Sequence, residues 1–522
     1  MQLIGTPVRA APVTPPPAIV QRPADRCFPA LVAVAALLSV GSAIYFHLAG
    51  LTLLYPDAQA RLLIARRVVD NLTPGLAQLG GVWLPLPQVA MLPLIWIDPL
   101  YYSGWAGSIP PMVAYVVTAA LLYRLGLLLT ADRASALLTA LIFLANPNVL
   151  YLQSTAMSEL PLFMLTVAAV YCLMAWSRDP RQTRYLMGAG LAIMLAVLTR
   201  YEGWALFLAA AALLLWVASV LRLSQERMEG YLLAFAVLPA YGIFLWLFWN
   251  QLIFHDFLYW QSSEYAKPAL WVSSSEAAVG NLGVAARAYL SATVYTTGLG
   301  LALAASAGLA LFLERERLDR RTIAVLVLLF PLPFFIVMLF LGQRPLHVPA
   351  INGDLYNVRF GLAMLLPVAV FCGYLCRRRR WATVAVTLLT CATIVWMGYS
   401  GSIVTLEEPL AWQGLSLNRE LREAGHWLAD HYDGGLILME SFGNESAQFQ
   451  SGIPLSRFVY EGNAELWYEA LEHPEAHVTW VFTRHQGTDE DRVWNTLGND
   501  PVLRSSFELV YRNGAIEIYR RL

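Results

Sequence analysis

The chain has 522 residues, of which 58% are hydrophobic and only 14% are charged, and its net charge is −1. Soluble globular proteins carry about 25% charged residues, so this composition excludes that class and indicates a membrane protein. The near-neutral charge gives no indication of a nucleic-acid partner, and none is expected.

The chain begins with a proline-rich stretch, residues 1–27, that has no long apolar run. This composition is typical of a disordered tail, which we expect in the cytoplasm. The apolar run that follows, Phe28–Gly50, is too long for the apolar part of a signal peptide, and further apolar runs come after it. We therefore expect it to remain in the protein as a membrane span.

About eleven apolar runs approach the roughly 20 residues that a helix needs to cross a bilayer. They are Phe28–Gly50, Ile109–Leu129, Ala134–Leu152, Leu160–Trp176, Tyr185–Leu198, Trp204–Leu221, Tyr231–Ile253, Tyr289–Phe312, Thr322–Leu341, Phe360–Leu375 and Trp381–Ile403. The run Val82–Ile97 contains three prolines, and we interpret it as an interfacial or re-entrant segment covered by protein. The sequence thus predicts an α-helical polytopic membrane protein with residues 28–403 as its transmembrane domain.

The arginines indicate which loops face the cytoplasm. With the N-terminus inside, the cytoplasmic loops carry about twice as many positive charges as the opposite loops, as the positive-inside rule requires. These loops hold Arg133, Arg178, Arg181, Arg184, Arg222, Arg227, Arg315, Arg317, Arg320, Arg321 and Arg377–Arg380. We therefore predict a multi-pass protein of the plasma or inner membrane, in contact with membrane lipids, whose N-terminus is cytoplasmic.

Residues 404–522, after the last run, are predicted to form a small extracytoplasmic α/β domain. It starts with an amphipathic helix, Asn418–His431. Asn513-Gly514 is a strong signal for a type I′ hairpin between the last two strands. The strand-like runs are Leu436–Met439, Arg457–Tyr460, Val478–Phe482, Phe507–Tyr511 and Ala515–Tyr519. The domain contains no cysteine, so its core must be sufficient without disulfides.

Acidic residues lie where apolar runs end, and by the topology above four of them face away from the cytoplasm. They are Asp57, Glu159, Glu202 and Asp354. Carboxylates at the rim of a helix bundle are costly to bury and mark functional sites more often than packing solutions. This pattern predicts an enzyme that works at the outer leaflet.

The first outer loop, residues 51–108, contains a segment that we expect to form an amphipathic helix along the membrane interface. Its Arg61, Arg66 and Arg67 are an exception to the positive-inside rule. They indicate either an anionic partner, such as a lipid-linked phosphate, or side chains that snorkel toward lipid headgroups. Asp57 can be an N-cap for this helix, or a general base whose pKa is set by neighbouring cations.

Four short motifs, in this order along the chain, resemble the GT-C glycosyltransferases, and more narrowly the protein O-mannosyltransferase and lipid A aminoarabinose transferase group. They are Tyr55–Arg67, Ser158-Glu159, Thr199–Gly203 and Asn357–Phe360. The resemblance covers residues 28 to about 403, together with the layout that ends in an outer domain.

The resemblance implies that Asp57 is the catalytic base and that Glu159 is a second site acid. The family often has a second acid directly after the first, but here that residue is Ala58. The pair Arg359-Phe360 matches the late pair that holds the lipid phosphate, although tyrosine is the more usual aromatic residue.

The implied reaction is an inverting transfer of a sugar from a polyprenyl-phosphate donor to a hydroxyl group of a glycan, lipid or protein. The phosphate would lie against Arg359, Arg200 and the group Arg61, Arg66 and Arg67. Glu159 and Glu202 would orient the sugar or bind a divalent cation, and no other cofactor is expected. Glu202 has the alternative role of an interfacial salt bridge to Arg200. Asp354 joins this set as a substrate-binding candidate.

Two other classes of function compete with the enzyme. A transporter or flippase of a lipid-linked glycan would place ionisable groups near the membrane midplane, whereas the predicted spans are almost free of charge in their interiors. A membrane scaffold that only displays its C-terminal domain would leave Asp57 and the three loop arginines without a purpose.

Overall fold

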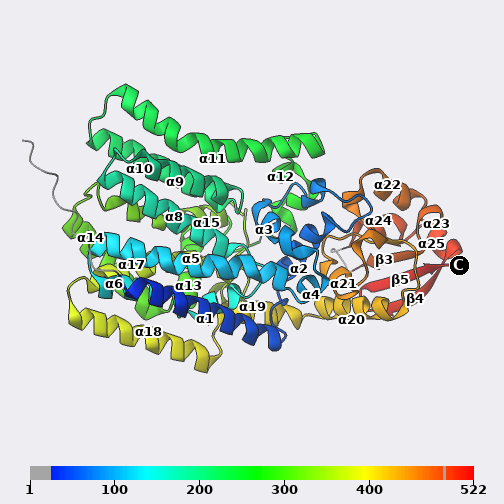
Figure 1. Ribbon diagram of the computed structural model, residues 1–522. Coiled ribbons are helices and arrows are strands. Elements are labelled where there is room, and N and C mark those ends of the chain that lie inside the picture. The colour runs from blue at the N-terminus through cyan, green and yellow to red at the C-terminus, as the bar shows by residue number, and fades with distance from the viewer. Residues whose placement is uncertain (1–24, 274, 486–489) are drawn as a thin grey trace, which may run out of the picture.

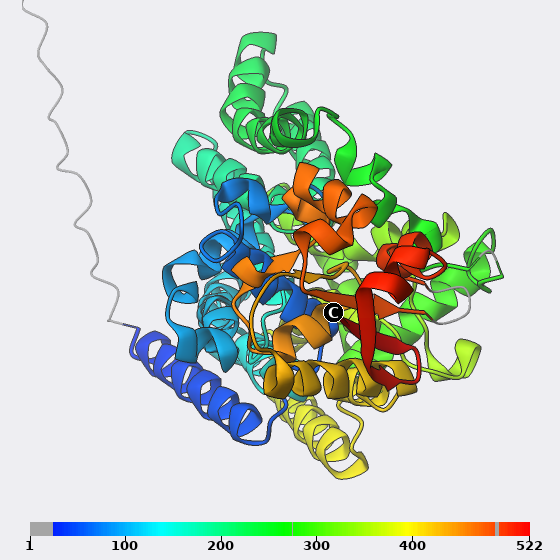
Figure 2. The same cartoon turned by 90° about the vertical axis from the view of Figure 1, so that its right-hand side faces the viewer.

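The computed structural model describes residues 25–273, 275–485 and 490–522. Two parts lie end to end (Figure 1): a bundle of long helices and, at one end of it, a smaller region that contains a β-sheet. We call residues 416–522 the sheet region. Figure 2 looks onto this region, with the helices of the bundle behind it and around it.

Eight helices of the described chain are long and apolar enough to cross a membrane, or nine if one sharply bent pair counts as a single span. The unbroken long helices are α1 (Cys27–Leu48), α5 (Trp105–Thr130), α8 (Glu159–Arg178), α10 (Glu202–Val220), α11 (Gln225–Phe254) and α18 (Arg380–Ser400). Two more continuous candidates join a 3-10 helix to an α-helix: η4 (Ile323–Leu329) with α15 (Pro331–Phe340), and η5 (Val358–Met364) with α17 (Leu365–Cys376). The expected helical membrane architecture is thus confirmed.

This count is lower than the eleven expected runs, because two of those runs form shorter helices. The run Ala134–Leu152 is divided at Pro147 into α6 (Arg133–Leu144) and α7 (Pro147–Leu152). Asn146 caps the second piece by accepting hydrogen bonds from two backbone N–H groups, so the break is stabilised locally. The run Tyr185–Leu198 becomes α9 (Thr183–Val197), whose 15 residues are fewer than the roughly 20 that a helix needs to cross a bilayer.

The bent pair consists of α13 (Leu282–Thr297) and α14 (Leu299–Glu316), which meet at 108°. Gly298 lies at the bend with a φ of +87°, and a Cβ built there would come within 2.6 Å of Thr393 Cγ2. A residue with a side chain would be strained at this position and would collide with α18. Glycine is therefore required for this bend.

The connection between α1 and α5 contains α2 (Pro56–Arg67), η1 (Leu76–Leu79), α3 (Leu86–Ile95) and α4 (Asp98–Tyr102). The apolar residues of α2, expected to face lipid from the membrane interface, instead face protein. Ala58, Leu62, Leu63 and Ala65 are fully buried, because α3 and α5 of the bundle and α21 of the sheet region pack against this helix. The segment expected to be re-entrant, Val82–Ile97, contains the short helix α3.

The sheet region follows α19 (Val404–Gln413) and starts with α20 (Ser416–His431), close to the predicted helix. Its strands are β1 (Ile437–Leu438), β2 (Phe458–Val459), β3 (Trp480–Arg484), β4 (Phe507–Asn513) and β5 (Ile516–Arg521). They form one sheet in the order β2-β1-β3-β5-β4, in which β1 pairs in parallel with β2 and β3, and β5 pairs antiparallel with β3 and β4. The predicted hairpin between the last two strands is confirmed. Its turn is not the predicted type I′ turn at Asn513-Gly514: the two loop residues are Gly514 and Ala515, and of these only Gly514 has the positive φ that type I′ requires at both positions.

Short helices complete the described chain. Those of the bundle and its loops are α12 (Tyr259–Ser262), η2 (Glu264–Ala266), η3 (Pro268–Leu270) and α16 (Pro349–Asn352). Those of the sheet region are α21 (Glu445–Gln450), η6 (Leu455–Arg457), η7 (Glu461–Asn463), α22 (Glu465–Glu472), α23 (Pro474–His477), α24 (Arg492–Leu497) and α25 (Pro501–Ser506). Trp467, Leu438 and Phe507 belong to a core of the sheet region itself.

Candidate active site

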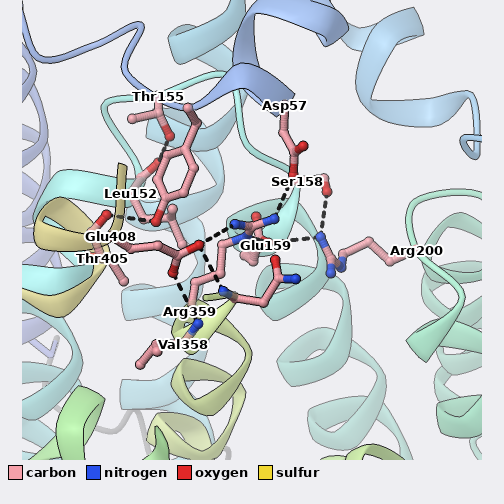
Figure 3. Close-up of polar contacts among 12 residues, drawn as sticks. Asp57, Leu152, Thr155, Ser158, Glu159, Arg200, Val358, Arg359, Thr405 and Glu408 are labelled. Atoms are coloured by element: carbon pink, nitrogen blue, oxygen red, sulfur yellow. Dashed lines mark hydrogen bonds and ion pairs between the residues drawn. The ribbon is translucent and has the colours of Figure 1, made fainter. Parts of the chain in front are cut away.

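A cluster of charged side chains lies where the helix bundle meets the sheet region, around Arg359 at the start of η5 (Figure 3). The guanidinium of Arg359 binds three carboxylates from distant parts of the chain. Its Nη2 is 2.6 Å from Asp57 Oδ2, its Nε is 3.2 Å from Glu159 Oε1, and its Nη1 is 3.0 Å from Glu408 Oε1. One buried cation thus joins α2, α8 and α19.

Arg200 extends the cluster on the side of α8 and α10. Its Nη1 donates to Glu159 Oε1 and to Ser158 Oγ, both at 2.9 Å, and its Nη2 is 2.7 Å from Glu202 Oε1. Glu159 and Glu202 each stand in the first turn of a helix, where the helix dipole favours a negative charge. Arg200 and Arg359 share one oxygen of Glu159, and the other oxygen has no hydrogen-bond partner in the described chain.

Glu408 holds the turn that presents Arg359. Its two carboxylate oxygens accept hydrogen bonds from the backbone N–H groups of Asn357, at 2.9 Å, and Val358, at 3.0 Å. Asn357 has a φ of +53°, in the left-handed region that asparagine tolerates better than most residues. The backbone therefore turns sharply just before Arg359, and a carboxylate from α19 stabilises that turn.

Asp57 is the most accessible acid of the cluster. Its side chain is 40% exposed, whereas those of Glu159, Glu202 and Glu408 are 3%, 7% and 2% exposed. It does not cap α2: the N-cap is Tyr55, Pro56 opens the helix, and Asp57 follows with its carboxylate on Arg359. The alternative that Asp57 serves as an N-cap is therefore wrong.

Arg61 lies one helical turn beyond Asp57 and is buried without an ion pair. Its guanidinium covers the ring of Trp83 at 4.5 Å, and its Nε and Nη1 have no hydrogen-bond partner among the described residues. Burial, and next the charge of Arg200, lower the pKa of the Arg61 guanidinium to about 10, so it still carries its charge at neutral pH. A buried cation with free donors is costly unless an anion joins it.

A cavity with one polar end and apolar walls opens beside the cluster. The polar end is formed by Glu159, Arg200, Glu202 and Arg359. The remaining lining residues are Leu162, Phe163, Thr166, Leu328, Phe330, Pro331, Phe335, Phe360, Ala363 and Leu366. Such a lining suits a molecule with a charged head and a hydrocarbon tail.

Three of the predicted site residues have contacts elsewhere. Arg66 donates to the carbonyl of Ile95 and pairs with Asp98, each at 2.7 Å. Asp354 pairs with His347 at 2.9 Å. Arg67 points to the sheet region, where its Nη2 donates to Gln448 Oε1 at 2.8 Å. The structure brings none of these three side chains into contact with the cluster.

The predicted residues that the structure does bring together are Asp57, Glu159, Arg200, Glu202 and Arg359, and Arg61 lies beside them. The sequence reasoning missed Glu408. A signal was present, because Glu407-Glu408 follows the last apolar run directly, as the other acids follow theirs. A divalent-cation site remains an expectation: in the described ranges, no group of three or more His, Cys, Asp or Glu residues is arranged to hold a metal.

Comparison with known proteins supports the expected resemblance. Residues 100–246 match the family described as dolichyl-phosphate-mannose-protein mannosyltransferase. No curated protein is significantly similar to the chain in sequence.

Solved structures resemble the chain over most of its length. ArnT from Cupriavidus metallidurans, bound to undecaprenyl phosphate, has a TM-score of 0.59 and 13% identity, and the match covers 95% of this chain and 97% of that one. The Archaeoglobus fulgidus oligosaccharyltransferase in its apo form has a TM-score of 0.52 and 12% identity, with 88% and 70% covered. The chain therefore has the GT-C-type fold, with the resemblance to the O-mannosyltransferase and aminoarabinose transferase group that its motifs indicated.

Proposed function

We propose that this protein is an inverting glycosyltransferase that moves a sugar from a polyprenyl-phosphate donor to an acceptor hydroxyl. The observation that carries the proposal is a buried cation with free donors, Arg61, beside an accessible carboxylate, Asp57, and a cavity with a charged end and apolar walls. The family match and the solved structure with undecaprenyl phosphate support the same donor class.

The donor phosphate would bind between Arg61, Arg200 and Arg359, because these are the cations of the cluster. The Nε and Nη1 groups of Arg61 are available to donate to phosphate oxygens. The polyprenyl chain would follow the apolar walls of the cavity, among them Phe335 and Leu366. Burial of hydrocarbon there contributes roughly 25 cal/mol per Å² of apolar surface.

Asp57 would act as the general base. Its carboxylate is oriented by Arg359 and remains accessible, so it can accept the proton of an acceptor hydroxyl. The oxygen of that hydroxyl would attack the anomeric carbon from the face opposite the phosphate, and the bond to the phosphate would break. A single displacement inverts the anomeric centre and requires no covalent intermediate on the protein.

The negative charge that develops on the departing phosphate would be stabilised by the same three arginines. The positions of Arg200 and Arg359 are fixed before the reaction, because Glu159, Glu202 and Glu408 hold them. Preorganised cations in a water-poor cavity are among the largest contributions to catalysis. Glu159 and Glu202 would thus orient the cations, in addition to any contact with the sugar.

The arginine distribution supports a reaction on the side of the membrane away from the cytoplasm, with the sheet region on the same side. Sugar transfer from polyprenyl-phosphate sugars, measured in nanodiscs with an extract of envelope acceptors, tests the proposal. We expect polyprenyl phosphate to be released with a glycosylated product of inverted configuration. Movement of the intact lipid-linked sugar across a proteoliposome membrane, without its consumption, would instead indicate a flippase.

A further inference from the structure

The helix α2 connects the cluster with the sheet region. Asp57 stands in its first turn and Arg67 at its last residue. Arg67 lies ten positions after Asp57, which corresponds to about 15 Å of α-helix at 1.5 Å per residue. The helix is buried on most sides and therefore transmits a displacement at one end to the other.

Arg67 is buried in a socket formed by the sheet region. Its Nη2 donates to Ser441 Oγ and, at 2.8 Å, to Gln448 Oε1. The guanidinium also covers the ring of Tyr460 at 4.0 Å. Hydrogen bonds donated by a cation are stronger than those between neutral groups. A buried guanidinium that also stacks on an aromatic ring has little freedom to move.

The residues after α2 strengthen this attachment. Asp70 accepts hydrogen bonds from the backbone N–H groups of Leu455 and Ser456, both at 3.1 Å. Asn71 Oδ1 accepts from Asn463 Nδ2 at 2.8 Å. Every partner in these contacts belongs to the sheet region, so the C-terminal end of α2 is fixed to it and not only to the helix bundle.

A second connection runs from the sheet region to the other half of the Asp57–Arg359 pair. The helix α19 directly precedes α20, and its Glu408 holds Arg359 and the turn before it. At the end of α19, Gln413 Nε2 donates to the carbonyl of Leu54, just before α2. The helix α19, which leads into the sheet region, therefore supports both partners of the ion pair.

We infer that the sheet region is a positioning frame for the catalytic base, and that Arg67 is the positioning residue that connects it to Asp57. This inference rests on the proposed function. A base must be held within a fraction of an ångström of the acceptor hydroxyl, because small misplacements reduce the rate strongly. Arg67, which the sequence offered as a phosphate ligand or as a side chain that snorkels toward lipid headgroups, here acts through α2 and touches no substrate.

The test uses Arg67→Met, Gln448→Leu and the double variant in the full-length protein, with transfer from a polyprenyl-phosphate sugar as the readout. Each single variant removes one partner of the Arg67–Gln448 hydrogen bond and replaces it with an apolar side chain of similar length. We expect kcat to fall by roughly 10- to 100-fold in both, since misplacement of a reacting group costs up to about 10² in rate. The donor KM should stay within about twofold of the wild-type value, and the double variant should be no slower than Arg67→Met.

A second readout follows the helix directly. Amide hydrogen exchange of residues 56–63 should become faster in Arg67→Met and Gln448→Leu, because the helix has lost its anchor. Asp98→Asn is the matched control: it removes an ion-pair partner of the neighbouring Arg66 that lies outside the sheet region, and it leaves Arg67, Asp70 and their contacts with the sheet region in place. It should leave kcat within about threefold of wild type and exchange at residues 56–63 unchanged. Arg67→Lys, which keeps a cation opposite Gln448, should recover part of the lost rate.

A higher donor KM at normal kcat in Arg67→Met, with no effect of Gln448→Leu, would show that Arg67 binds the donor and would overturn the inference. Wild-type rates and wild-type exchange in both variants would overturn it as well. If Arg67→Met does not fold, Gln448→Leu and Arg67→Lys decide the question. Absence of transfer by the wild-type protein would instead count against the proposed function, and hydrogen exchange would still test the attachment of α2.

Discussion

At the scale of single residues, the arginines of the cluster fall into two kinds. Arg359 pairs with three carboxylates, two of which are almost fully buried. Its removal would leave the buried Glu408 without its ion pair and Glu159 with Arg200 alone. Loss of a buried ion-pair partner costs roughly 3–5 kcal/mol, so loss of activity would not identify the role of Arg359. Arg61 has no such partners. Substitution of Arg61 is therefore the cleaner test of phosphate binding.

Arg61→Met should weaken donor binding and stabilise the protein at the same time. The loss of a charge-assisted contact to phosphate costs about 1.5–3 kcal/mol, or about tenfold or more in the dissociation constant of undecaprenyl phosphate. The melting temperature of the empty protein should be unchanged or higher, because a buried cation without a partner has been removed. Lipid titration and thermal melting in nanodiscs measure both effects. Normal affinity for the lipid would exclude Arg61 from the phosphate site.

Asp57→Asn should abolish most turnover and leave the donor affinity close to normal. Asparagine has the size of aspartate but cannot accept the acceptor proton, and general-base catalysis contributes about 10²–10⁴-fold. We expect turnover to fall by about that factor, with insertion and thermal stability nearly retained. The assay is transfer from a polyprenyl-phosphate sugar under saturating donor. If the variant keeps its activity, the base must be Glu159 or Glu202.

At the scale of elements, the length and apolarity of the runs predicted most long helices, but not where two of them break. The breaks at Pro147 and Gly298 have local signals, yet proline and glycine also occur inside unbroken membrane helices, such as Pro239 within α11. Only the tertiary structure shows why the bend at position 298 needs a glycine: a Cβ there would collide with Thr393. Whether a predicted helix breaks at such a proline or glycine therefore depends on tertiary contacts.

The placement of α2 could not be predicted from its sequence for a related reason. An arginine-rich amphipathic helix has the same pattern whether it faces lipid headgroups or another part of the protein. The surface that buries Arg67 is formed by residues 441–460, almost four hundred positions later in the chain. The position of acids at the ends of apolar runs did predict Asp57, Glu159 and Glu202 as site residues. Arg200 and Arg359 were predicted from the motifs that resemble the GT-C glycosyltransferases.

The junction of α19 and η5 gives a prediction at this scale. Glu408→Gln should loosen the turn at Asn357, because a neutral amide binds Arg359 and the two backbone N–H groups less strongly than a carboxylate does. We expect a loss of about 2–4 kcal/mol in stability, from charge-assisted hydrogen bonds worth roughly 1.5–3 kcal/mol each. Thermal melting, and hydrogen exchange at Asn357 and Val358, measure it.

The neighbouring acid provides the control. Glu407→Gln changes the same charge one residue earlier, on a partly exposed side chain, and should alter stability by less than about 0.5 kcal/mol. An equal effect of the two substitutions would show that the net charge of α19 matters, and not the contacts of Glu408.

For the whole molecule, the site lies at the end of the bundle that adjoins the sheet region, where the acids and arginines of the bundle meet Glu408 of α19 (Figures 1 and 3). The arginine distribution predicts that this junction lies on the side of the membrane away from the cytoplasm. A substrate that reaches the accessible Asp57 must be present on that side.

A reporter fused after Leu522 should lie outside the cytoplasm. A phosphatase that folds only outside the cytoplasm should be active there, and a fluorescent protein that folds only inside should be dark. Fusions within the arginine-rich loop at Arg315–Arg321 should show the opposite pattern, since the positive-inside rule places that loop in the cytoplasm. A fluorescent C-terminal fusion would invert the assigned topology and the side of the reaction.

The position of Glu408 also limits how this architecture can recombine. A crossover between two related chains at residue 403, where the apolar runs end, would replace Glu408 and Gln413 together with the sheet region. The foreign α19 would then have to supply a carboxylate for Arg359 and a donor for the carbonyl of Leu54. A crossover after Gln413 keeps these contacts. The foreign C-terminal region must then mainly provide the residues that bind Arg67. We therefore expect chimeras joined after α19 to tolerate foreign C-terminal regions better than chimeras joined before it.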